Sequence, residues 1–109
     1  MLNAGLTVCL GTDSLASTPT LSMLDEMRFL HRRDDRLPGH VLLHMATLAG
    51  AFGLRREQAN GSLTPGKYAD LTVIALPDRD EADPHRLLLD SDLSVIKTMI
   101  GGRFVFHVR

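Results

Sequence analysis

Asp13 is the residue of this sequence whose type and position most clearly suggest chemistry. It follows a run of β-forming residues from Leu6 to Leu10 and then Gly11, so it is expected just beyond the end of a buried strand. A carboxylate in that place loses solvation unless it is paired, hydrogen-bonded or bound to a metal ion. A helix cap or a turn would satisfy the same carboxylate, and on spacing alone that is the commoner explanation.

Two histidines, His40 and His44, stand four residues apart and would share one face of a helix. Such a pair can bind a metal ion, but no glutamate follows His40 and no third ligand is evident in the sequence. Because His44 lies in the apolar run 41–45, we interpret it as a packed or interface histidine. We interpret His40 as a surface residue of the first helical turn.

A third pattern, from Gly61 to Lys67, has the spacing of a phosphate-binding loop. Tyr68 stands where that loop needs a serine or threonine to hold magnesium, and Pro65 removes one backbone donor. No convincing strand precedes the pattern. The sequence therefore favours a tight turn.

The first half of the chain is predicted to contain two helices after the strand. Apolar residues spaced by three predict an amphipathic helix over 21–31, in which Glu26 and Arg28 form a surface pattern. Pro38 suits the first turn of a second helix over 38–52, which Gly53 would end. Its apolar face is formed by Val41, Leu42, Met45, Leu48, Ala49 and Phe52.

The second half reads mostly as strands. A strand is predicted over 69–76, followed by a charged connector over 77–84. Two β-prone runs, 95–100 and 103–108, flank Gly101-Gly102, a pair that suits a two-residue hairpin turn. The elements together indicate an α+β fold.

Composition restricts the classes of partner. Twelve Lys and Arg against thirteen Asp and Glu give a formal net charge of −1, so neither nucleic acid nor a membrane surface is an expected partner. Cys9 is the single cysteine and is predicted to pack as a small hydrophobe. No run approaches the roughly 20 apolar residues of a membrane span, so we expect a soluble cytoplasmic protein.

Three segments resemble the metal-dependent amidohydrolase superfamily. The run GLTVCLGTDS at 5–14, with MLDEMR at 23–28, resembles the last barrel strand of that superfamily and the helix after it. GSLTPGKYADL at 61–71 is similar to the segment that leads into its small β-sandwich, and the hairpin at 95–106 resembles the one that closes the sandwich. The likeness covers nearly the whole chain and is strongest to deaminases and chlorohydrolases acting on purine-like or triazine-like rings.

The resemblance implies a fragment of a (β/α)8 TIM-barrel hydrolase joined to part of a composite β-sandwich. Residues 1–59 would supply the final strand and helices, and residues 60–109 the sandwich part. Asp13 is implied as both metal ligand and catalytic residue, which takes the proton of a metal-bound water and passes it to the leaving ammonia. The metal would be Zn²⁺, Fe²⁺ or another divalent ion in the complete enzyme.

The family's other ligands, a His-x-His pair and later single histidines, have no counterpart in this sequence, and neither does its general acid glutamate. We therefore expect a C-terminal portion of a hydrolase that binds no metal tightly and is inactive alone, with Met1 aligned inside a longer chain. Two alternatives are a non-catalytic interaction or assembly module and a split enzyme whose partner chain supplies the histidines. Self-association is expected through exposed strands and helix faces. The small heterocyclic substrate would bind the full-length enzyme.

Overall fold

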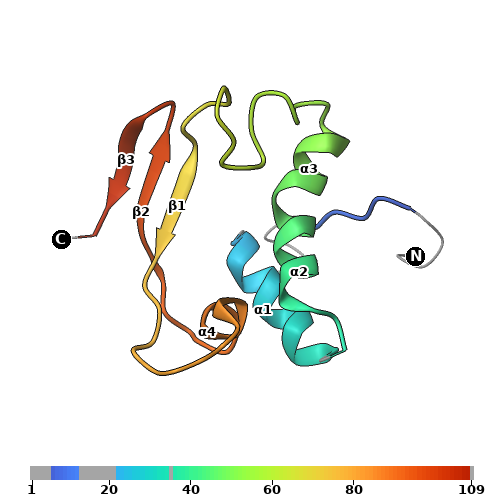
Figure 1. The fold of residues 1–109 in the computed structure, drawn as a ribbon, viewed down its shortest axis with the longest axis vertical. Coiled ribbons are helices and arrows are strands. Elements are labelled where there is room, and N and C mark those ends of the chain that lie inside the picture. Colours follow the sequence, from blue (N-terminus) through green and yellow to red (C-terminus); the bar gives the residue numbers. More distant parts are fainter. Residues whose placement is uncertain (1–5, 13–21, 35, 109) are drawn as a thin grey trace.

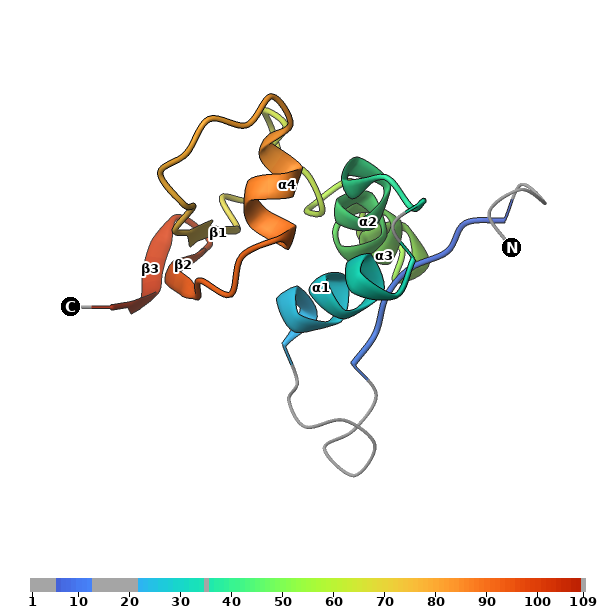
Figure 2. The same cartoon turned by 90° about the horizontal axis from the view of Figure 1, so that it is seen from below.

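The structure is a computed structural model that describes residues 6–12, 22–34 and 36–108. Helices α1 to α3 gather on one side, a three-stranded sheet lies on the other, and α4 lies between them (Figures 1 and 2). This arrangement confirms the α+β class. In chain order the elements are α1 (Met23–Arg33), α2 (Gly39–Ala46), α3 (Leu48–Gly53), β1 (Leu71–Ile74), α4 (Pro84–Leu89), β2 (Val95–Ile100) and β3 (Arg103–His107).

Helix α1 confirms the first predicted helix, with both ends two residues later than predicted. Ser22 is its N-cap, and the serine hydroxyl accepts a hydrogen bond from the backbone N–H of Asp25 at 3.2 Å. Acidic residues occupy its first turn and basic residues its last turn, as the helix dipole favours. The capping serine thus sets the start of the helix.

The second predicted helix is divided into α2 and α3 at Thr47, so the prediction of one continuous helix was wrong. Thr47 has φ −127° and ψ −91°, outside the helical range. Its hydroxyl donates to the carbonyl oxygen of Leu43 at 2.7 Å. A β-branched residue that bonds back to the preceding turn is a recognised cause of helix bending.

The core lies among the helices. Met27, Leu42 and Leu89 form a buried cluster, with Leu42 wholly inaccessible. On the predicted apolar face, the buried positions include Leu42, Met45 and Ala49, but Phe52 is 56% exposed, which corrects that part of the prediction. Phe52 lies beyond the break between α2 and α3, one residue before the end of α3.

The sheet has the order β1-β2-β3 with antiparallel neighbours, and the predicted hairpin is confirmed. Gly101 and Gly102 have φ of +59° and +83°, which glycine adopts without strain. Strand β1 is shorter than the predicted strand. One irregularity interrupts the hairpin: Thr98 pairs with Phe106 and Met99 with Phe104, so the intervening Val105 has no register partner.

Helix α4 was not predicted, and the expected connector over 77–84 is wrong at its end, where the helix begins. Asp83 is the N-cap, and its carboxylate accepts from the backbone N–H of His85 at 3.0 Å. Pro84 occupies the first turn, where a missing N–H costs nothing. The sequence Asp-Pro followed by an apolar run was the available signal for this helix.

Residues 6–12 are not in a strand, so the predicted strand from Leu6 to Leu10 is wrong here. Cys9 is exposed and does not pack as a small hydrophobe. The backbone N–H of Leu10 donates instead to the carbonyl oxygen of Met45 at 3.1 Å. A strand needs a neighbouring strand to satisfy its backbone, and the sheet lies elsewhere (Figure 1). Within the described residues, every helix is too short or too polar to cross a membrane.

Candidate functional site

Asp13, the predicted metal ligand and catalytic residue, lies outside the described residues. The chain approaches it through residues 6–12, which Leu10 ties to the end of α2, and resumes at Ser22, the cap of α1. The role of Asp13 therefore stays a prediction. The other predicted site residues lie within the described part of the chain and can be placed.

The two histidines of α2 are both exposed, so His44 is not a packed residue in this chain and its role as an interface residue stays a prediction, while the interpretation of His40 as a surface residue is confirmed. The ring of His40 lies edge-on to that of His85 with centroids 6.3 Å apart. Within residues 6–12, 22–34 and 36–108, no three His, Cys, Asp or Glu side chains are grouped so that they could hold a metal ion. The described residues thus do not fit a self-sufficient metal centre.

The segment from Gly61 to Lys67 forms the predicted tight turn. Lys67 donates through Nζ to the hydroxyl of Ser62 at 2.9 Å and to the carbonyl oxygen of Asn60 at 3.4 Å. The ammonium group that would hold a phosphate is therefore bound to oxygens of its own loop. Gly61 has φ +94°, and a Cβ there would lie 2.6 Å from the Cβ of Ala51, so glycine allows the loop to pack against α3.

Arg28 is buried, which corrects its interpretation as part of a surface pattern. The side chain is 5% exposed, and Nε donates to the carbonyl oxygen of Leu88 in α4 at 3.0 Å. Burial lowers the pKa of the guanidinium from its ordinary value, and the charges of Asp25 and Asp92 oppose that shift. Arginine stays protonated in proteins, so a positive charge is held between α1 and α4.

Two histidine–aspartate pairs lie at the two ends of α4. His31 Nε2 of α1 lies 2.6 Å from an Asp90 carboxylate oxygen, and His85 Nδ1 lies 2.8 Å from that of Asp83. Hydrogen bonds from the His85 side chain and backbone lower the pKa of Asp83. The sequence gives no signal for the first pair, because His31 and Asp90 lie 59 residues apart. Asp83 and His85 are two residues apart, at the start of α4, a helix that was itself not predicted.

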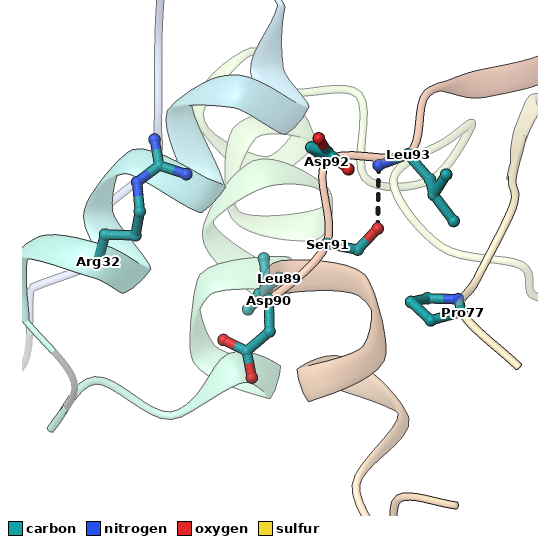
Figure 3. Close-up of a pocket in the computed structure, with 7 residues that line it drawn as sticks. All are labelled: Arg32, Pro77, Leu89, Asp90, Ser91, Asp92 and Leu93. Atoms are coloured by element: carbon teal, nitrogen blue, oxygen red, sulfur yellow. Dashed lines mark hydrogen bonds between the residues drawn. The ribbon is translucent and has the colours of Figure 1, made fainter. Parts of the chain in front are cut away.

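An open pocket of about 600 Å³ lies where α1 meets the segment that follows α4. Figure 3 shows Arg32 of α1 on one side and Asp92 on the other. It also shows the hydrogen bond by which the Ser91 hydroxyl accepts from the backbone N–H of Leu93, at 2.9 Å. The lining residues are Arg32, Pro77, Leu89, Asp90, Ser91, Asp92 and Leu93. No catalytic constellation is formed by these residues.

Comparison with known proteins places this arrangement in a family. The model of the amidohydrolase family matches residues 1–105. A 5-methylthioadenosine/S-adenosylhomocysteine deaminase from Syntrophomonas wolfei is 35% identical over the whole chain, which covers 28% of that protein. An adenosine deaminase from Xanthomonas campestris, crystallised with bound zinc, superposes with a TM-score of 0.85 at 26% identity, over 97% of this chain and 27% of its own.

A variant of a triazine hydrolase is also similar, with a TM-score of 0.81 and 30% identity over 97% of this chain and 26% of its own. The chain thus spans little more than a quarter of the length of the proteins it matches. The match of the family model extends over almost every residue. This chain therefore belongs to the amidohydrolase family.

Proposed function

We propose that these residues form the C-terminal portion of a metal-dependent amidohydrolase, a hydrolytic deaminase or chlorohydrolase that acts on C–N or C–Cl bonds of a small heterocyclic substrate. We also propose that they are inactive alone. The observation that carries the proposal is the superposition of 97% of the chain on 27% of a zinc-containing adenosine deaminase, at a TM-score of 0.85.

Within that enzyme, residues 1–59 would belong to the end of a (β/α)8 barrel, and residues 60–109 to a small β-sandwich. Helices α1 to α3 lie in the first of these parts and all three strands in the second, while Leu89 of α4 packs from the second part into the core of the first. Barrel active sites lie at the C-terminal ends of the strands. Residues 6–12 lead directly to Asp13, which we propose as a metal ligand and catalytic residue.

A catalytic zinc site normally has three protein ligands and one open position. The described residues contain no group of three potential ligands, so a single aspartate would leave the site incomplete. The remaining ligands would come from the part of the enzyme that this chain does not span.

A chimeric enzyme tests the proposal. The segment of the Syntrophomonas wolfei deaminase that matches this chain is replaced by residues 1–109, and release of ammonia from 5-methylthioadenosine and S-adenosylhomocysteine is measured. The chimera is expected to be active and to lose at least about 100-fold in activity when Asp13 is changed to Ala, since even indirect partners of metal ligands cost 10–100-fold.

Matched controls separate folding from chemistry. An Asp78→Ala change in the chimera removes an exposed aspartate of the sheet part and should leave activity unchanged. The isolated chain with Zn²⁺ should release no ammonia and should bind Zn²⁺ no more tightly than its Asp13→Ala variant in calorimetry. Deamination by the isolated chain would falsify the claim that it is inactive alone.

A non-catalytic interaction or assembly module is the second candidate. It is favoured by β3, every residue of which is exposed, with Phe104 and Phe106 among the accessible side chains. A chimera that folds and retains zinc but shows no deaminase activity would support this candidate over the first.

A further inference from the structure

Helix α4 lies between strands β1 and β2 in the sequence, but it packs against helices α1 and α2. The chain leaves the sheet after β1, forms α4, and returns to the sheet as β2. The main contacts of α4 are with α1 and α2, whereas the strands contact one another. In both views α4 lies between the sheet and the other helices (Figures 1 and 2). Helix α4 therefore connects the three-stranded sheet to helices α1 and α2.

The apolar attachment of α4 depends chiefly on Leu89. This side chain is 2% exposed and packs in one cluster with Met27 of α1 and Leu42 of α2. The start of α2 also comes close: a Cβ built on Gly39 would lie 2.6 Å from the Cβ of His85. A glycine at this point lets the two backbones approach.

Polar contacts fix the orientation of α4. The Leu88 carbonyl is one of the last four of the helix, which have no partner within it, and Arg28 Nε donates to it. A cation at a helix C-terminus is also favoured by the helix dipole. His31 holds Asp90, the C-cap residue, at 2.6 Å. Two side chains of α1 thus bind the C-terminal end of α4.

These contacts are few for an element that connects two parts. Helix α4 has six residues, fewer than an isolated helix needs for stability in water. Arg28 Nη2 is buried without a hydrogen-bond partner among the described residues, and that offsets part of the gain from Nε. The opening of α4 should therefore cost less free energy than the unfolding of α1 and α2.

A second attachment joins the sheet to α3 at the opposite end. Residues 59–70 form a compact loop, closed by a hydrogen bond from Tyr68 N to the carbonyl oxygen of Ala59 at 2.9 Å. The loop packs through Gly61 against α3 and is bonded to the hairpin by Gly102 N, which donates to the carbonyl oxygen of Ala69 at 3.0 Å. We name residues 59–70 the hinge loop.

We propose that α4 is a latch that fastens the sheet to the helical cluster, and that it opens reversibly as a unit while α1 and α2 stay folded. With the latch open, the sheet moves relative to the helices about the hinge loop. The inference rests on the contacts of α4 and does not depend on the proposed function.

Native-state hydrogen exchange of the unmodified chain, measured in a series of low urea concentrations, tests the latch. The α4 amides, from Arg86 to Asp90, are expected to exchange through an opening with a weaker urea dependence than that of the α1 and α2 amides, because less surface is exposed. If the α4 amides instead follow the same urea dependence as those of α1 and α2, the elements open together and the latch does not exist.

A pair of leucine variants provides the second arm. Leu89→Ala removes the buried anchor and destabilises the native state relative to both the latch-open and the unfolded state, so exchange of the α4 and the α1 amides should accelerate by a similar factor of about 30 or more. Leu93→Ala, at a leucine that is 39% exposed, is the control and should leave both rates nearly unchanged. Met45→Ala, at a buried residue of α2 outside the Leu89 cluster, should accelerate the α1 and α2 amides and leave the α4 amides nearly unchanged, because α2 stays folded when α4 opens. Equal acceleration of α1 and α4 in Met45→Ala would overturn the proposal.

Discussion

The helical cluster and the sheet differ in how far they bury their apolar side chains. Leu42 is fully buried and Met27 is 4% exposed, whereas no residue of β1, β2 or β3 is buried and β3 is exposed throughout. A sheet of three strands needs a second layer over one face to be stable by itself. The helices therefore carry the stability of this chain, and the sheet has apolar surface available for another layer.

The strongest test of this difference is a pair of large-to-small substitutions. Leu42→Ala should lower the free energy of unfolding by about 3 kcal/mol, because it leaves a cavity in the core. Phe104→Ala, at a ring that is 55% exposed, should cost less than about 1 kcal/mol. Urea unfolding followed by circular dichroism measures both. Equal costs would mean that the sheet is as well packed as the helices.

A second pair of substitutions examines the loop between the two regions. Gly61 and Gly66 both have positive φ, +94° and +96°, but a Cβ at Gly61 would meet Ala51 at 2.6 Å, while one at Gly66 would meet nothing within 4 Å. Gly66→Ala should cost about 1 kcal/mol from backbone strain, and Gly61→Ala about 2–3 kcal/mol because overpacking adds to the strain. Thermal unfolding of both variants decides whether the contact with α3 matters.

Measurements of self-association can show which exposed apolar surface, that of the sheet or that of the helices, mediates contact between copies of the chain. We expect the apparent mass in light scattering to rise with concentration, as open strand edges and apolar patches favour. Replacing Phe104 and Phe106 by serine should weaken association by about tenfold or more, given the area of two rings. Phe29→Ser, at an exposed ring of α1, is the matched change in the helical region. A monomer at every concentration would contradict the expectation.

The smallest expected effect is the acid sensitivity of α4. The hydrogen bonds from His85 hold the pKa of Asp83 below its ordinary value of 3.8, so the cap stabilises the fold above that pH and is lost as the pH falls through the lowered value. Asp83→Asn keeps a good cap without titrating. Amide exchange in α4 between pH 2 and 6 should therefore vary less in this variant, while Asp78→Asn, at an exposed residue, should behave as the unmodified chain.

The elements that the sequence predicts well are those with local signals. The hairpin follows from two β-prone runs and a Gly-Gly turn, and α1 from apolar residues spaced by three. Elements determined by distant contacts were missed or misplaced. Helix α4 is short, the burial of Arg28 depends on a carbonyl sixty residues away, and residues 6–12 contact α2 where a strand had been expected.

The candidate site is predicted less completely than the fold. The turn at Gly61 to Lys67 was recognised because Tyr68 and Pro65 oppose phosphate binding, and the lysine indeed bonds to its own loop. Exposure of His44 was not foreseen, because a histidine in an apolar run resembles a core residue until the helix is packed. Asp13 remains a prediction supported by the family resemblance.

The unpaired Val105 has a consequence for how the sheet can be covered. Register partners share a face, and Thr98 and Met99 are adjacent on β2, so their partners Phe106 and Phe104 present rings on opposite sides of the sheet. Residues two apart in a regular strand would share one side. Deletion of Val105 would make the two phenylalanines adjacent in a regular strand and would leave their rings on opposite sides. The extra residue therefore allows a Phe-Val-Phe sequence, whose rings would otherwise share one side, to place an aromatic ring on each side of the sheet.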